Sequence, residues 1–76
     1  MIKAKIKEGH KGFYDQYEEP AVRLLEGGQT LTIERQEDNK YVCSVVNPSD
    51  LSKSFGVQEG MWILVHKGNL EITGEI

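Results

Sequence analysis

Short segments in which hydrophobic and polar residues alternate recur along the whole chain. Alternation with a period of two residues is typical of a half-buried β-strand. The pattern covers residues 2–7, 30–34, 41–46 and 70–76, and a continuous apolar run over 61–65 suits a central strand. These five segments are therefore predicted to be strands.

Turns separate these segments. Residues 37–40 are a polar hairpin loop, and Asn47-Pro48 is expected to break the sheet. Ser49 is a suitable N-cap for one helical turn over 50–55, which Gly56 would end. Five short strands and tight turns in a single domain, residues 1–76, predict an all-β fold. The expected architecture is a small, closed or nearly closed barrel with one short helical turn, since closure removes exposed edges.

Residues 20–28 fit two structures. Pro20 before the segment and Gly27-Gly28 after it fit a two-turn helix. The apolar run over 21–25 fits a segment that returns into a strand equally well. A helix this short has little stability of its own, which favours an irregular or strand-like segment.

Charge is distributed unevenly. The net charge is −3, but the first 11 residues hold four lysines against one glutamate, a local +3, so the remainder holds −6. The last predicted strand carries Glu71 and Glu75. Antiparallel pairing of the first and last strands would set lysines opposite glutamates. A lysine stripe that binds nucleic acid or another anion is the alternative, although 9 basic against 12 acidic residues disfavour nucleic acid as a general partner.

Size and composition exclude several classes of protein. A chain of 76 residues has no room for a separate cofactor domain. No apolar run approaches the roughly 18 residues of a membrane span, and no signal peptide opens the chain. The single Cys43 excludes an intramolecular disulfide, and its strand-like setting predicts a buried thiol. A reducing cytoplasm, of a bacterium or of an infected host cell, is the expected compartment.

No pattern of catalytic or metal-binding residues stands out. His10 and His66 are the only histidines and lack the spacing of metal ligands, and the glycines lack the lysine and hydroxyl of a phosphate loop. The chain is therefore predicted to be a non-enzyme without a cofactor. Ile33 and Ile63 are predicted to be core residues. Trp62 is predicted to be a core residue too, and if the barrel does not cover it, it would instead mark a binding face or a dimer interface.

Residues 13–19, Phe-Tyr-Asp-Gln-Tyr-Glu-Glu, resemble the aromatic-acidic opening of Src-homology-three domains. Residues 28–33 are similar to the glycine-led second strand of that family, and 38–42 to its polar hairpin. The resemblance covers about residues 13–46. Tyr41-Val42 replaces the family's pair of tryptophans, and its Gly, Pro and Asn-Tyr features are not found between 46 and 55.

The resemblance implies a small Src-homology-three-like barrel with a shallow aromatic groove and an acidic wall. Such a groove binds polyproline helices, because rings stack on proline and carboxylates accept Arg or Lys. The predicted partner-binding residues are Tyr14, Asp15, Tyr17, Glu18, Glu19 and Tyr41. Alternation places Phe13, Asp15 and Tyr17 on one strand face and Tyr14, Gln16 and Glu18 on the other. Either Phe13 and Tyr17 are core residues while Tyr14 and the acids are only solvated, or the aromatic-acidic loop carries the function.

The predicted function is a non-catalytic protein-interaction module of bacterial or phage origin, with association between copies of the chain left open. It would bind a protein partner through the aromatic-acidic loop, because binding residues collect on loops and tyrosine gives a large contact area. The alternative is a small acidic phage-type inhibitor that blocks a nucleic-acid-binding site on a host enzyme.

Overall fold

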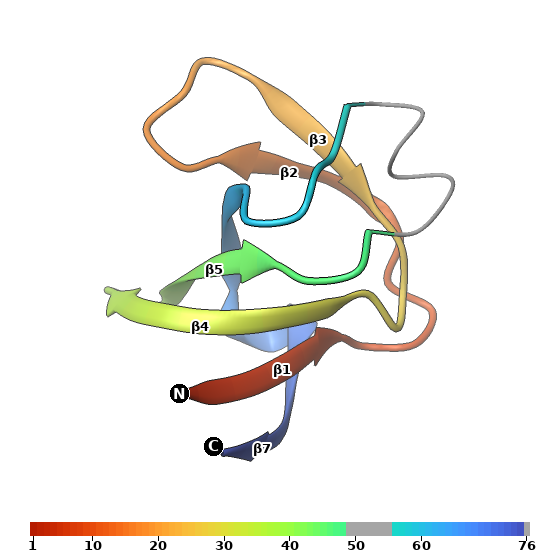
Figure 1. The fold of residues 1–76 in the computed structure, drawn as a ribbon, viewed down its shortest axis with the longest axis vertical. Coiled ribbons are helices and arrows are strands. Elements are labelled where there is room, and N and C mark those ends of the chain that lie inside the picture. The colour runs from red at the N-terminus through yellow and green to blue at the C-terminus, as the bar shows by residue number, and fades with distance from the viewer. Residues whose placement is uncertain (49–55, 76) are drawn as a thin grey trace.

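Seven antiparallel β-strands form one open sheet in the computed structural model, which describes residues 1–48 and 56–75 (Figure 1). The order of strands across the sheet is β3-β2-β6-β5-β4-β1-β7. The strands are β1 (Ile2–Ile6), β2 (Gly12–Gln16), β3 (Val22–Leu25), β4 (Thr30–Glu37), β5 (Lys40–Val45), β6 (Trp62–His66) and β7 (Leu70–Glu75), with a 3-10 turn, η1 (Lys67–Asn69), between the last two. The helical turn predicted over 50–55 lies outside the described residues.

The five predicted strands all form, as β1, β4, β5, β6 and β7, but the predicted number was wrong. β2 and β3 add a hairpin in which Phe13 lies opposite Leu24. β2 also pairs with β6, where Asp15 lies opposite Leu64. The sequence pattern does not reveal this pairing between distant segments, which joins the hairpin to the rest of the sheet. The ambiguous segment after Pro20 is thus a strand, as favoured. Within the described residues the sheet has two edges, β3 and β7, so it is open rather than closed.

The main cluster of buried hydrophobic residues lies on one face of the sheet. Ile63 is fully buried, as predicted. Ile33 is only partly buried and packs against the core cluster. Trp62 is 41% exposed, so its assignment to the core was wrong. Ile63 and Val65 take the inner face of β6, and strand alternation therefore sets Trp62 on the outer face. The core cluster comprises Ala4, Ile6, Leu25, Leu31, Cys43, Val45, Val57, Ile63, Val65 and Leu70.

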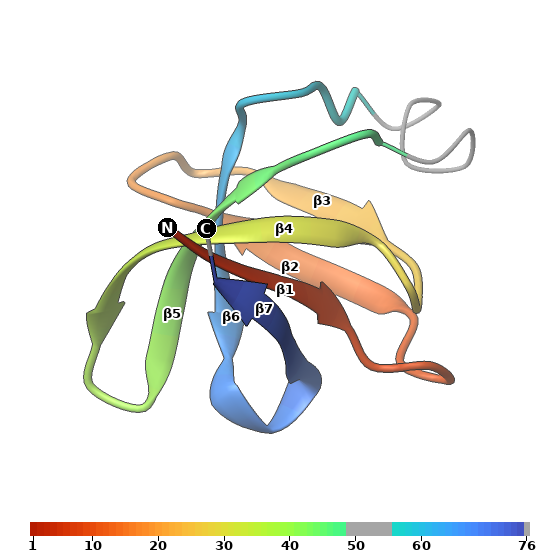
Figure 2. The same ribbon diagram turned by 60° about the horizontal axis from the view of Figure 1, so that its bottom comes forward.

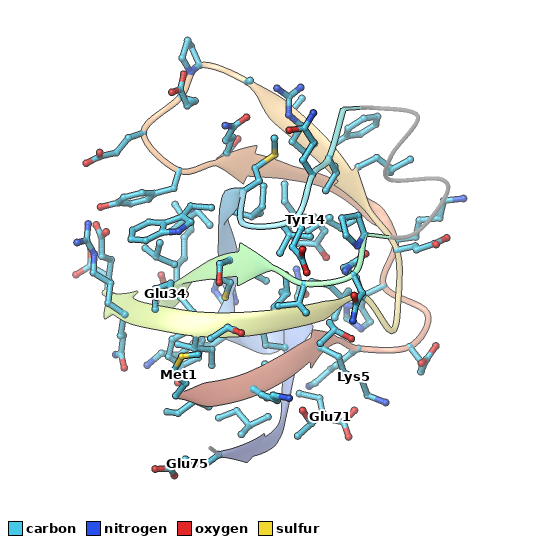
Figure 3. All side chains as sticks on the ribbon, viewed as in Figure 1. Met1, Lys5, Tyr14, Glu34, Glu71 and Glu75 are labelled. Atoms are coloured by element: carbon cyan, nitrogen blue, oxygen red, sulfur yellow. The ribbon has the colours of Figure 1, made fainter. Side chains whose placement is uncertain are left out.

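The first and last strands pair antiparallel, as the charge distribution predicted. Lys5 lies directly opposite Glu71 (Figure 3). A register shift between Lys3 and Ala4 then sets Lys3 opposite Gly74 and places Glu75 opposite Ile2. Lys5 and Glu71 are therefore directly opposite each other, whereas the bulge keeps Lys3 and Glu75 from lying opposite each other.

Cys43 is fully buried, which confirms its prediction as a core thiol. Burial, together with the nearby negative charge of Glu34, raises the thiol pKa to about 12. In the part of the chain that the structure describes, no helix has the length and apolar character needed to cross a membrane.

Candidate functional site

The turn between β2 and β3 is tied to the backbone of β6. The N–H of Tyr17 donates to the carbonyl of Trp62 at 2.9 Å, one residue beyond the last pair of the β2–β6 ladder. The N–H of Glu19 closes the turn by donating to the carbonyl of Gln16 at 3.2 Å. Between them Glu18 has a φ of 58°, a left-handed conformation that costs a residue with a Cβ about 1–2 kcal/mol. The turn is thus held in one shape at a conformational cost.

The rings of Tyr17 and Trp62 lie together beside this turn. Their centroids are 6.0 Å apart and their planes are inclined by 40°, within the range of favourable aromatic pairs. The guanidinium carbon of Arg35 lies 5.0 Å from the centroid of the Tyr17 ring, and Arg35 Nη2 donates to the Tyr17 hydroxyl. Glu37 Oε2 accepts from the same Nη2 at 3.2 Å. We call Tyr17, Trp62 and Arg35 the aromatic platform.

A β-bulge in β4 brings Arg35 to the platform. The register shifts between Ile33 and Arg35, so that Ile33 lies opposite Cys43 and Arg35 opposite Val42. Glu34 is the extra residue, and it accepts a hydrogen bond from the Ser44 hydroxyl at 2.7 Å. Regular alternation would turn Arg35 toward the core, but the bulge moves it to the outer face, which Trp62 also occupies.

Exposed carboxylates lie on either side of Tyr17 in the sequence. The turn carries Glu18 and Glu19, and Asp15 lies at the end of β2 opposite Leu64 on the outer face. Among the described residues, the ion pair found joins Arg35 to Glu37, so no described cation pairs with these three carboxylates. The surface is therefore an aromatic platform with an acidic border.

The other two predicted tyrosines lie on the core side of the sheet. Tyr14, labelled in Figure 3, and Tyr41 are both partly buried, and each packs against the hydrophobic core. Desolvation raises the pKa of Tyr14, although a hydrogen bond with the Asn69 side chain opposes the shift. The ammonium of Lys67 lies 5.4 Å from the centroid of the Tyr41 ring. The three tyrosines consequently do not share one face, and the described residues enclose no pocket.

Phe13 points toward solvent and Tyr14 points toward the core, the reverse of what a buried Phe13 would require. Phe13 is 63% exposed, whereas Tyr14 turns inward together with Gln16. Gln16 Oε1 accepts from Arg23 Nε at 3.1 Å across the hairpin, which satisfies the polar group on the inner side. The interpretation of Phe13 as a core residue was therefore wrong.

The two histidines stabilise turns and lie on separate elements. His10 Nδ1 is 3.2 Å from Asn69 Oδ1, and His66 Nδ1 accepts from the Gly68 N–H at 3.1 Å. In the described ranges no group of three or more histidine, cysteine or carboxylate side chains is arranged to hold a metal ion. The chemistry that this surface offers is binding by ring stacking and charge.

Two platform residues escaped the sequence analysis. Arg35 was missed because a bulge leaves no trace in hydrophobic alternation. Trp62 could have been placed by alternation from Ile63 and Val65, had their burial been used to orient β6. No protein-family model, curated protein or solved structure matches the chain. The geometry of the platform and its acidic border is therefore the basis for the functional inference.

Proposed function

We propose that this chain is a non-catalytic protein-interaction module that binds its partner through the aromatic platform and its acidic border. The observation that carries the proposal is the exposed Trp62 ring, paired with Tyr17 on the surface rather than buried. Tryptophan, tyrosine and arginine are the residues that most often dominate the energy of protein interfaces. The platform consists of one of each.

The platform is organised before any partner binds. Its members come from three elements: the β2–β3 turn supplies Tyr17, β6 supplies Trp62 and β4 supplies Arg35. The hydrogen bond from the Tyr17 N–H to the Trp62 carbonyl holds the main chain of Tyr17, and the contacts of Arg35 hold its side chain. A rigid surface loses little conformational entropy on binding, which favours affinity.

The partner that this surface suits is a basic segment with apolar or proline residues beside its cations. The exposed rings would contact the apolar side chains, and Asp15, Glu18 and Glu19 would accept hydrogen bonds from lysine or arginine. The same combination supports a divergent Src-homology-three-like interpretation of the fold.

Selection from a random peptide display library tests this function. Selected peptides are titrated against the protein while the fluorescence of Trp62, the single tryptophan, is recorded. We expect basic residues to be enriched among the binders, the Trp62 emission to change, and affinity to fall at least about tenfold in Tyr17→Ala and Glu18→Gln. Glu75→Gln, an exposed acid on β7, is the matched control and should bind like the wild type.

Two results would refute the proposal. One is a selection that returns no binder at all. The other is a set of binders that leave Trp62 fluorescence unchanged and tolerate Tyr17→Ala and Glu18→Gln, with circular dichroism showing that both variants are folded.

A further inference from the structure

A single row of side chains crosses five strands on the outer face of the sheet. Asp15 lies directly opposite Leu64 on β6 and directly opposite Val22 on β3. Leu64 also lies opposite Val42 on β5, and Val42 lies opposite Arg35 on β4. Residues directly opposite in antiparallel strands share a face. Figure 2 shows β5 and β6 side by side, and Figure 1 shows β2 beside β3. We call these five residues the transverse row, which in order across the sheet consists of Arg35, Val42, Leu64, Asp15 and Val22.

The transverse row joins the aromatic platform to the β2–β3 hairpin. Trp62 lies two residues from Leu64 on β6, and therefore on the same face. Val42 is fully buried although it lies on the outer face and outside the main core cluster. Side chains of the outer face therefore pack over Val42. The platform thus stands on an apolar base, and the row extends this base toward β3.

The end of the row on β3 is apolar and open to solvent. Val22 is 53% exposed, and Asp15 is an exposed carboxylate between Val22 and the half-buried Leu64. Phe13, Val22 and Trp62 all lie on the outer face, and they are three of the six exposed large hydrophobic residues in the described part of the chain. A charged acceptor therefore lies between two exposed apolar positions, the platform on one side and Val22 on the other.

Building on the proposed function, we propose that the partner is an extended segment in which a lysine or arginine lies between two apolar residues. One apolar side chain contacts the platform, the cation pairs with Asp15, and the second apolar side chain contacts Val22. A segment that covers Leu64 and Val22 removes the Asp15 carboxylate from water. A cation then forms a charge-assisted hydrogen bond with Asp15, whereas a segment without one leaves a buried charge unpaired. Asp15 is therefore the specificity-determining residue of the site.

The register also limits where the cation is accommodated. Trp62 and Val22 are separated by two strand spacings and by two residues along a strand, about 12 Å, which three to four extended residues span. Arg35 occupies the other end of the row, three strand spacings or about 14 Å from Asp15, and disfavours a basic residue there. The partner's cation thus has one preferred position, with an apolar residue on each side of it within about five residues.

Selections from a random peptide display library against charge-reversed variants test this inference. We expect the wild type to select a basic residue flanked by apolar residues, and Asp15→Lys to select an acidic residue in the same flanked position. Glu75→Lys, which reverses an exposed charge on β7 at the opposite edge of the sheet, should select the wild-type pattern. Val22→Thr should weaken the peptides selected by the wild type about fivefold, whereas Ile72→Thr, also exposed but on β7, should leave their affinity unchanged.

A double-mutant cycle measures the contact itself and tolerates a loss of stability in any one variant. The probe is the tightest peptide selected by the wild type, with its flanked basic residue kept or replaced by norleucine. Asp15→Asn and the norleucine peptide should each lower affinity at least about tenfold, and the two together should lower it little further. Additive losses would overturn the inference, as would an unchanged basic preference in folded Asp15→Lys. Peptides that change Trp62 fluorescence but show neither pattern overturn this inference alone, whereas a selection without any binder overturns the proposed function as well.

Discussion

The backbone of Tyr17 donates a hydrogen bond to Trp62 at 2.9 Å, and the rings of the same two residues lie 6.0 Å apart. The turn residue and the strand residue are thus coupled through both main chain and side chain. The double contact joins this pair on the surface, whereas Ile63, the neighbour of Trp62 on β6, is buried in the core. Changes in the core and changes at the platform should therefore have separable effects on stability and on binding.

The first prediction concerns the core. Ile63→Ala removes a fully buried side chain from the central part of β6 and should cost about 2–5 kcal/mol of unfolding free energy. A core of this size supplies about 3–5 kcal/mol, so the variant should be largely unfolded at room temperature. Circular dichroism in increasing urea measures the effect. An unchanged midpoint would show that β6 does not present Ile63 to the core.

The second prediction concerns the left-handed conformation of Glu18. Glycine adopts positive φ without a Cβ clash, so Glu18→Gly should raise the free energy of unfolding by about 1 kcal/mol while it weakens peptide binding. Asp38→Gly is the matched control, because Asp38 also has a positive φ, 55°, but lies in the β4–β5 turn. It should stabilise the protein to a similar extent without changing affinity. Equal peptide affinity of the two variants would show that Glu18 does not contribute to binding.

The third prediction concerns the pH dependence of stability. The pKa of Cys43 is raised by burial from 9.0 to about 12, so the unfolded chain releases this proton at lower pH than the folded one. Its contribution to stability is complete below pH 9.0 and is lost as the pH rises toward 12. Cys43→Ala should therefore be less sensitive to alkaline pH in urea titrations. If the free energy of unfolding fell equally steeply with pH in the wild type and in Cys43→Ala, the raised pKa of a buried Cys43 thiol would be contradicted.

The fourth prediction concerns the pair formed by Lys5 and Glu71. Lys5→Glu places like charges opposite each other and should lower stability by about 0.2–1 kcal/mol, an effect that salt reduces. The double variant Lys5→Glu, Glu71→Lys should recover most of the loss. Lys3→Glu serves as the control, because Lys3 lies opposite Gly74 and should respond less. No recovery in the double variant would mean that the two charges do not interact.

The sequence predicts the strands well where local pattern determines them. β1, β4, β5, β6 and β7 follow from alternation or from an apolar run, and the polar turn after Glu37 follows from residue type. Charge alone indicated the pairing of β1 with β7, which are distant in the chain. The β2–β3 hairpin was missed as a pair of strands because its stability depends on pairing with β6, a contact between distant segments.

The candidate site was only partly predictable for the same reason. Asp15, Tyr17, Glu18 and Glu19 were proposed from their composition, and they lie at the end of β2 and in the turn that follows it. Arg35 and Trp62 reach the aromatic platform through a bulge in β4 and through the face that β6 presents. The position of Arg35 depends on the register between β4 and β5, which a single sequence does not encode in a readable pattern, whereas the position of Trp62 follows from alternation once Ile63 and Val65 are known to be buried.

The central claim, that the aromatic platform and its acidic border bind the partner, is tested most directly by the indole N–H signal of Trp62 in a two-dimensional nitrogen–proton NMR spectrum. As the only tryptophan, it gives one assigned probe in the platform. On addition of a selected basic peptide, we predict that this signal shifts together with the backbone signals of Tyr17, Glu18 and Arg35, while those of Lys5 and Glu71 stay in place. Shifts confined to β1 and β7, with the indole signal unmoved at saturation, would contradict the claim.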